Sequence, residues 1–324
     1  MSNLEHLAIP EPDSPSALDK ARENPETYTL LEDVLLNKSG KVQLHDQFRA
    51  LFTLKCLGNE RSIDIIADGF SDPSALLRHE LAYVLGQMGN PYAIPKLLKI
   101  LEIKDEDPMV RHEAAEAMGA ISDPSAIEIL ERYLDDPEKA VSETCELAIA
   151  KIKYDQEQKA EAPEVQSAYT SIDPAPPSTE ESIEKLKEVY LNPKKHLFER
   201  YRAMFALRNI GTTEAVLALA EGFDDESALF RHEIAFVYGQ MQHTASVPAL
   251  IKVLTNAEEA PMVRHEAAEA LGSIASPEVL PILQKFRADN VKVVADSCNV
   301  ALDMYEYENS EQFQYTILPK GDKA

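Results

Sequence analysis

An internal repeat constrains this chain of 324 residues more than any other feature of its sequence. The motif Arg-His-Glu begins at Arg78 and again 33 residues later at Arg111, and both copies recur after a shift of 153 residues, at Arg231 and Arg264. At that shift, residues 49–154 align with the second half without a gap. Repeats of about 20–50 residues predict a stack of small units that pack mainly on their neighbours.

The patterning inside each repeat predicts helices. The chain has only 11 Gly, and residues 93–101 place apolar side chains at i, i+3, i+4 and i+7. Many segments begin at an Asp-Pro pair, in which Asp caps the helix and Pro, which lacks a donor, takes the first helical position. These pairs are Asp72-Pro73, Asp107-Pro108, Asp123-Pro124 and Asp136-Pro137. We therefore expect an all-α solenoid with about four helix pairs in each half, similar to HEAT-like repeats.

Shifts in composition divide the chain into two pseudo-symmetric halves with a tether between them. Pro and acidic residues are frequent in the expected linker, which reads as extended and flexible. The expected parts are a loosely held N-terminal segment (1–26), an N-terminal half (27–154), the linker (155–180), a C-terminal half (181–307) and a tail (308–324).

Charge and cysteine content exclude several classes of protein. Thirty-two Lys and Arg against 56 Asp and Glu give a net charge of −24, which argues against binding nucleic acid, because phosphate backbones need a cationic face. Three Cys are too few for a disulfide scaffold and favour a reducing compartment. No stretch of 18 apolar residues and no secretory signal are present, so we expect an intracellular protein that does not insert into membranes.

Four of the eight His residues lie in Arg-His-Glu at one position of the repeat. Copying of an ancestral repeat explains their origin, but a solenoid does not need His there for packing, and neighbouring positions have changed. We interpret the four His-Glu pairs as metal ligands. They are His79 with Glu80, His112 with Glu113, His232 with Glu233, and His265 with Glu266.

The ligand types limit the metal. Nitrogen and oxygen donors without Cys disfavour structural zinc and suit iron or manganese. Adjacent residues of a helix point about 100° apart, so one His-Glu pair does not clamp an ion alone. Neighbouring repeats, stacked about 10 Å apart, can converge on a shared ion. Each half then supplies enough ligands for one ion, and two facing halves make a dinuclear site.

Two other sets of repeated residues are expected to be structural. Arg78, Arg111, Arg231 and Arg264 occupy the place where HEAT-like repeats have an Arg that bonds to neighbouring caps. The matched pair Cys145 and Cys298 is expected to behave as small buried apolar residues.

Four His-Glu pairs on HEAT-like repeats, two in each half with a Pro-rich linker between, resemble the deoxyhypusine hydroxylase family. The resemblance covers roughly Arg49 to Tyr154 and Glu181 to Tyr305, and all four motifs match. It implies a monooxygenase with two ferrous ions that uses dioxygen and an external reductant. The implied substrate is the deoxyhypusine side chain of the hypusine-bearing eukaryotic translation factor, which hydroxylation completes. We expect a monomer located in the cytoplasm and also in the nucleus.

The resemblance also implies roles for individual residues. His79, His112 and Glu113 would hold one iron, and His232, His265 and Glu266 the other. Glu80 and Glu233 either ligate metal or bind the amines of the substrate arm. The remaining residues implied in substrate binding are Gly86, Gly239 and Met262, for each of which helix packing is an alternative.

Two other functions remain open at this point. A non-catalytic scaffold would bind a protein partner on its concave face without a metal. A metal-dependent hydrolase with zinc or manganese in the same cage would work without dioxygen. The tandem His-Glu arrangement speaks against the scaffold, and only the resemblance separates the oxygenase from the hydrolase.

Overall fold

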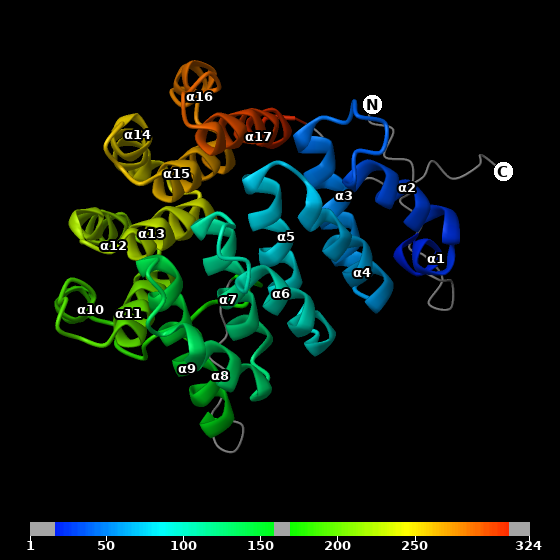
Figure 1. Ribbon diagram of the computed structural model, residues 1–324. Coiled ribbons are helices and arrows are strands. Elements are labelled where there is room, and N and C mark those ends of the chain that lie inside the picture. The colour runs from blue at the N-terminus through cyan, green and yellow to red at the C-terminus, as the bar shows by residue number, and fades with distance from the viewer. Residues whose placement is uncertain (1–16, 159–168, 311–324) are drawn as a thin grey trace, which may run out of the picture.

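The computed structural model describes residues 17–158 and 169–310, and within them all regular structure is helical. Eight inner helices alternate with eight outer helices along the chain, and each outer helix packs on the inner helix that follows it. This arrangement gives four helix pairs in each half, and it confirms the predicted all-α architecture (Figure 1). No helix in the two described stretches is long and apolar enough to cross a membrane.

The inner helices carry the residues that face the centre of the molecule. They are α3 (Leu44–Leu57), α5 (Ala75–Gln87), α7 (Pro108–Ile121), α9 (Lys139–Gln158), α11 (Leu197–Ile210), α13 (Ala228–Met241), α15 (Pro261–Ile274) and α17 (Lys292–Glu308).

The outer helices are shorter. They are α2 (Pro25–Leu35), α4 (Glu60–Asp68), α6 (Ile94–Leu101), α8 (Ser125–Leu130), α10 (Ile183–Tyr190), α12 (Thr213–Ala220), α14 (Val247–Thr255) and α16 (Leu280–Phe286). Helix α1 (Ala17–Glu23) precedes the pairs, and 3-10 turns occupy Gly69–Ser71, Pro91–Ala93, Glu131–Tyr133, Glu221–Asp224 and Thr244–Ser246.

The helix starts follow the Asp-Pro prediction only in part. Asp107 caps α7 by accepting a hydrogen bond of 2.9 Å from the backbone N of Met109, with Pro108 as the first helical residue, as predicted. The other three pairs lie one or two residues before their helices. At Asp72-Pro73, for example, Asp72 accepts from the backbone N of Ser74, and Ser74 is the residue that caps α5.

The two halves close into a ring of inner helices. Helix α17 lies beside α3, and α9 lies beside α11, so each half ends against the beginning of the other (Figure 1). Two hydrogen bonds related by the shift of 153 residues join the halves: Ser74 to Asp296 and Ser227 to Glu143. Each half also contributes a side chain to the hydrophobic core of the other half. Val300 packs in the N-terminal core, and its counterpart Leu147 packs in the C-terminal core.

The arginine before each His-Glu pair bonds to neighbouring turns, as predicted, and these bonds fix the rotation of its helix. Arg111 donates to the backbone O of Leu101 and to both carboxylate oxygens of Asp136. Arg264 makes the equivalent contacts in the second half. Since the next residue on a helix points about 100° away, anchoring these arginines among the outer turns directs the histidines inward.

The ends of the expected domains differ from the structure. Residues 17–23, expected in a loosely held segment, form α1, because Arg22 donates to the backbone O of Leu57 and of Cys56 and so holds this helix on α3. Residues 1–16 and 311–324 lie outside the described residues, and so does most of the expected tail.

The expected linker also differs. Helix α9 extends through residues 155–158, and residues 159–168 lie outside the described residues. Residues 169–180 have no regular structure, as predicted, but they pack on the ring: Ala175 is fully buried, and Asp173 pairs with Arg208. This part of the linker is therefore a fixed element of the structure.

Candidate metal centre

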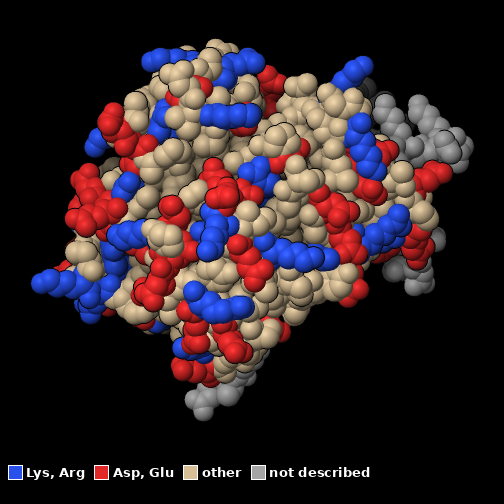
Figure 2. Space-filling view, in the orientation of Figure 1, with Lys and Arg blue, Asp and Glu red and all other residues tan. Residues whose placement is uncertain are grey.

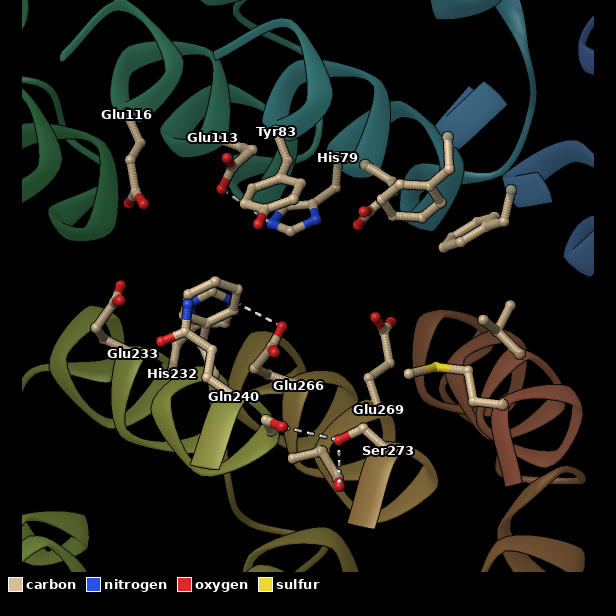
Figure 3. A pocket seen from close by; sticks show the side chains of 18 of the residues that line it. His79, Tyr83, Glu113, Glu116, His232, Glu233, Gln240, Glu266, Glu269 and Ser273 are labelled. Atoms are coloured by element: carbon tan, nitrogen blue, oxygen red, sulfur yellow. Dashed lines mark hydrogen bonds and ion pairs between the residues drawn. The ribbon is translucent and has the colours of Figure 1, made fainter. Parts of the chain in front are cut away.

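The four His-Glu pairs lie on the two middle inner helices of each half. Helices α5 and α7 carry the first two pairs, and α13 and α15 carry the other two. All eight residues are buried, and none has more than 8% of its total surface exposed. Figure 3 shows the side chains of α5 and α7 pointing across the centre toward those of α13 and α15. The ring closure therefore brings residues that are up to 187 positions apart in the sequence into one site.

The four imidazoles form a single cluster. The ring centre of His79 lies 5.6 Å from that of His112, 5.9 Å from that of His232 and 5.2 Å from that of His265. The ring centre of His232 lies 5.3 Å from those of His112 and His265. His79 is thus in contact with all three other histidines.

Two groups of donor atoms in this cluster are close enough to share an ion. One group is His79, His112 and Glu113, and the other is His79, His232 and His265; in each, the donor atoms lie within 4.8 Å of one another. The first group coincides with the ligand set expected for one iron. The second combines the two halves, whereas the expected set was His232, His265 and Glu266. Glu266 is nevertheless adjacent, with its Oε2 3.4 Å from Nε2 of His232.

The donor atoms fit a divalent metal because most of them have no other partner. Both ring nitrogens of His79, His112 and His232, and Nε2 of His265, are buried without a hydrogen bond. Nε2 of His79 is 3.2 Å from Oε2 of Glu113, but the two groups are not aligned as a hydrogen bond. An unsatisfied buried polar group costs about 1–3 kcal/mol, and a bound cation would remove that cost for several of them at once.

The electrostatics of the cluster also favour a cation. Burial, together with repulsion from neighbouring carboxylates, raises the pKa of Glu80, Glu233 and Glu266 well above its usual value. Burial lowers the pKa of His232 to about 3, with a further contribution from His79. Burial likewise lowers the pKa of His112 and His265 well below its usual value. These three imidazoles are therefore neutral and have a free lone pair, as metal binding requires. Burial acts in the same direction on His79, but nearby carboxylates, chiefly Glu113, outweigh it and raise the pKa of this histidine.

Cysteine takes no part in the centre. Cys145 and Cys298 are fully buried in the cores of the two halves, and burial raises the pKa of each thiol to about 12. Both residues behave as the small apolar groups that the sequence predicted. The candidate centre therefore has only nitrogen and oxygen donors.

The site is also lined by two carboxylates that were not predicted from the sequence. Glu116 and Glu269 lie three residues after Glu113 and Glu266, one helical turn further along, and both face the cavity (Figure 3). Oε1 of Glu269 accepts a hydrogen bond of 3.0 Å from Oγ of Ser297 and lies 3.5 Å from Nδ1 of His265. The spacing contained this signal, because residues three or four apart on a helix share a face, and these glutamates follow each His-Glu pair at those distances.

The centre opens into a cavity of about 480 Å³. Its polar wall is formed by two of the four histidines, His79 and His232, and by the six Glu side chains described above, together with Gln240 and Ser273. Its apolar wall includes Tyr83 and Phe236, whose ring centres are 5.9 Å apart, and side chains of α3 and α17. The site therefore combines carboxylates with an apolar surface.

The residues expected in substrate binding lie in different places. Glu80, Glu233 and Gly239 line the cavity, whereas Gly86 and Met262 do not. Met262 lies in the first turn of α15 and packs against the C-terminal core. Gly86 lies against α7, where a Cβ atom would come within 2.7 Å of the Cα of Ala117.

The two glycines give a matched prediction. We expect Gly86→Ala to lower the free energy of unfolding by about 1–3 kcal/mol, because the added methyl would force α5 and α7 apart. At Gly239 the same methyl would meet its nearest neighbour, the Cα of Ala270, at 3.4 Å, an ordinary contact, so we expect a change within about 1 kcal/mol. Urea unfolding of both variants measures the difference. Equal stabilities would contradict the close helix approach at Gly86.

Comparison with known proteins agrees with this fold and site. A family model for HEAT repeats matches residues 49–150 and 216–303, and one for the PBS lyase HEAT-like repeat matches residues 199–225. The ring of helix pairs around a buried His-Glu cluster thus defines a HEAT-repeat protein with a candidate metal centre.

Curated relatives place the chain more narrowly. It is 55% identical to deoxyhypusine hydroxylase of Candida albicans, over 89% of this chain and 95% of the relative, and 53% identical to that of Homo sapiens, over 85% and 90%. The solved structure of human deoxyhypusine hydroxylase in complex with glycerol superposes with a TM-score of 0.85 at 49% identity, covering 89% of this chain and 98% of that one. The chain belongs to the deoxyhypusine hydroxylase family.

Proposed function

We propose that this protein hydroxylates the deoxyhypusine side chain of the hypusine-bearing eukaryotic translation factor and so completes hypusine formation. The reaction uses dioxygen and an external reductant, and two ferrous ions bind in the His-Glu centre. The observation that supports this proposal best is the convergence of all four His-Glu pairs in one buried cluster of a deoxyhypusine hydroxylase family member.

The ligands proposed for iron are the four histidines with Glu113 and Glu266. Seven of the eight ring nitrogens are buried without a hydrogen bond, and nitrogen and carboxylate donors suit ferrous iron. Bound iron supplies the redox chemistry through which dioxygen reacts with an unactivated C–H bond. The protein itself positions the arm and keeps bulk water away from the centre.

The substrate arm carries amines on an aliphatic chain, and the cavity offers complementary groups. Glu80 and Glu233 belong to neither group of close donor atoms, yet both are buried and line the cavity. We propose that they accept hydrogen bonds from the ammonium groups of the arm. Figure 2 shows acidic and basic side chains interspersed over one face of the molecule, so the specific complementarity lies in the cavity rather than on that face.

Hydroxylation is tested on the purified chain after anaerobic addition of ferrous iron. We expect about two iron ions per chain, because each half supplies ligands for one ion. With dioxygen and a reductant, mass spectrometry should show one oxygen atom added to the deoxyhypusine-bearing factor. Turnover that persists without dioxygen, or that needs zinc or manganese instead, would favour a hydrolase and contradict the proposal.

Replacing the two amine-binding carboxylates separates substrate binding from metal binding. We expect Glu80→Gln and Glu233→Gln each to raise the KM for the factor about tenfold or more, since a charge-assisted hydrogen bond contributes about 1.5–3 kcal/mol. The iron content should remain that of the unmodified protein. A loss of iron in either variant would instead identify that carboxylate as a metal ligand.

We propose a monomer, for which light scattering of the iron-loaded protein is the direct measurement. We also propose that it is located in the cytoplasm and the nucleus, which fractionation of cells would test.

A further inference from the structure

The second part of the linker forms a strap over one side of the centre. We use the term strap for residues 169–176. The carboxylate of Asp173 accepts hydrogen bonds of 2.9 and 2.6 Å from the two terminal nitrogens of Arg208, which is fully buried. The ring of Tyr169 lies over the same guanidinium at 4.3 Å. A buried bidentate pair of this kind holds the strap in a fixed position.

The strap also joins the two halves. The side chain of Gln87 on α5 donates to the backbone O of Ile172 at 2.9 Å and accepts from its backbone N at 2.8 Å. Gln240 on α13, the counterpart of Gln87 at the shift of 153 residues, donates to Oγ of Ser171 at 2.8 Å. The single strap therefore bonds to both glutamines of a pseudo-symmetric pair. As a result, the two sides of the ring are not covered in the same way.

The cavity extends away from the strap. Gln240, which the strap contacts, lines one part of it, and no strap residue is among its lining residues. From the centre the cavity continues between α3 and α17 as far as Glu308, which is exposed. We call this part the α3–α17 mouth, and its lining residues are Phe48, Phe52, Val300, Met304, Tyr307 and Glu308.

The equivalent position at the other ring closure is filled. The counterparts of Val300 and Met304 on α9 are Leu147 and Lys151. Leu147 is buried in the C-terminal core, and Lys151 forms an ion pair with Asp155. Neither residue lines the main cavity. Among the residues that the structure describes, the cavity is thus open at one of the two pseudo-equivalent sides and closed at the other.

We propose that the amine-bearing arm of the substrate protein enters the cavity through the α3–α17 mouth and that the strap closes the opposite side. This inference rests on the proposed function, because it takes the occupant to be a long aliphatic amine. The aromatic and aliphatic wall of the mouth suits methylene groups, and the carboxylates beyond it, Glu80 and Glu269, suit ammonium groups. The surface around the mouth, which ends at Glu308, then contacts the body of the substrate protein.

Site-specific labels on the two sides test this direction of entry. Cys56, the exposed native thiol, is first replaced by Ser, because Cys145 and Cys298 are buried. A single cysteine is then introduced as Glu308→Cys at the mouth or as Thr170→Cys on the exposed part of the strap. Each iron-loaded variant is assayed with the deoxyhypusine-bearing factor before and after reaction with a bulky fluorescent maleimide.

Labelling at position 308 should lower kcat/KM by at least about tenfold relative to the same variant unlabelled, because the label occupies the docking surface, and labelling at position 170 should change it less than about twofold. The fluorescence of the label at 308, but not at 170, should change when the factor is added. Inhibition from position 170 alone, from both positions or from neither would overturn the proposed direction. An unmodified protein that adds no oxygen to the factor contradicts the proposed function instead, and the fluorescence then still reports where the factor docks.

Discussion

His79→Ala is expected to abolish turnover and to weaken metal binding more than any other single His replacement. His79 belongs to both groups of close donor atoms, one within its own half and one shared with the other half. Because even partners outside the ligand set contribute about 10- to 100-fold to metal affinity, we expect the loss of this shared ligand to weaken metal binding by at least about a hundredfold. Elemental analysis after dialysis measures the metal, and far-UV circular dichroism should show unchanged helicity.

Two control variants sharpen this result. His112→Ala removes a donor from one group only, so part of the metal should remain. His45→Ala removes a partly exposed histidine beside Asp46, outside the centre, and should bind as much metal as the unmodified protein. If His79→Ala keeps its metal, His79 is not a ligand, and if it unfolds, the histidine cluster acts in packing.

Arg208→Ala is expected to give a large loss of stability. Its guanidinium is fully buried and pairs with Asp173 and Gln240, so its removal leaves the Asp173 carboxylate with only 10% of its surface exposed and without its charged partner. Breaking a buried ion pair from one side costs about 3–5 kcal/mol. Urea unfolding of the metal-free protein should show a decrease of that size.

The chain supplies a matched control for this variant. Lys55 occupies the position of Arg208 in the first half, but it is partly exposed, and its ammonium lies about 6 Å from the rings of Phe52 and Tyr83. We expect Lys55→Ala to cost less than about 1 kcal/mol. The double variant with Asp173→Ala should recover part of the stability lost in Arg208→Ala. Equal losses at the two positions would mean that the strap does not depend on this pair.

The repeat made the fold and much of the candidate site predictable. The shift of 153 residues placed His79 and His232, and likewise His112 and His265, at equivalent positions, and helical periodicity put them on one face of each inner helix. That reasoning needs only local structure, and HEAT-like helix pairs repeat the same local structure. The structural role of the arginine in each Arg-His-Glu motif was predictable for the same reason, because each of these arginines contacts only its own repeat and the next.

The relation between the halves was not predictable from the sequence. It depends on contacts between residues far apart, such as Val300 in the N-terminal core and Leu147 in the C-terminal core, and no periodicity encodes them. The mixed group of His79, His232 and His265 follows from this docking alone. The Pro and acidic residues of the strap predict a flexible segment, and nothing in the sequence identifies Arg208 as the partner of Asp173.

The closed ring is geometrically equivalent to an isologous dimer of a half-length chain. Two such chains related by a twofold axis would form every contact in duplicate, including Ser74 with Asp296 and its counterpart Ser227 with Glu143. In one fused chain each copy of a contact can change alone. Lys55 and Arg208 show that this has happened, because the two positions are equivalent and only one binds the strap. A symmetric dimer could not close one of its two entrances without closing the other, and a single chain can.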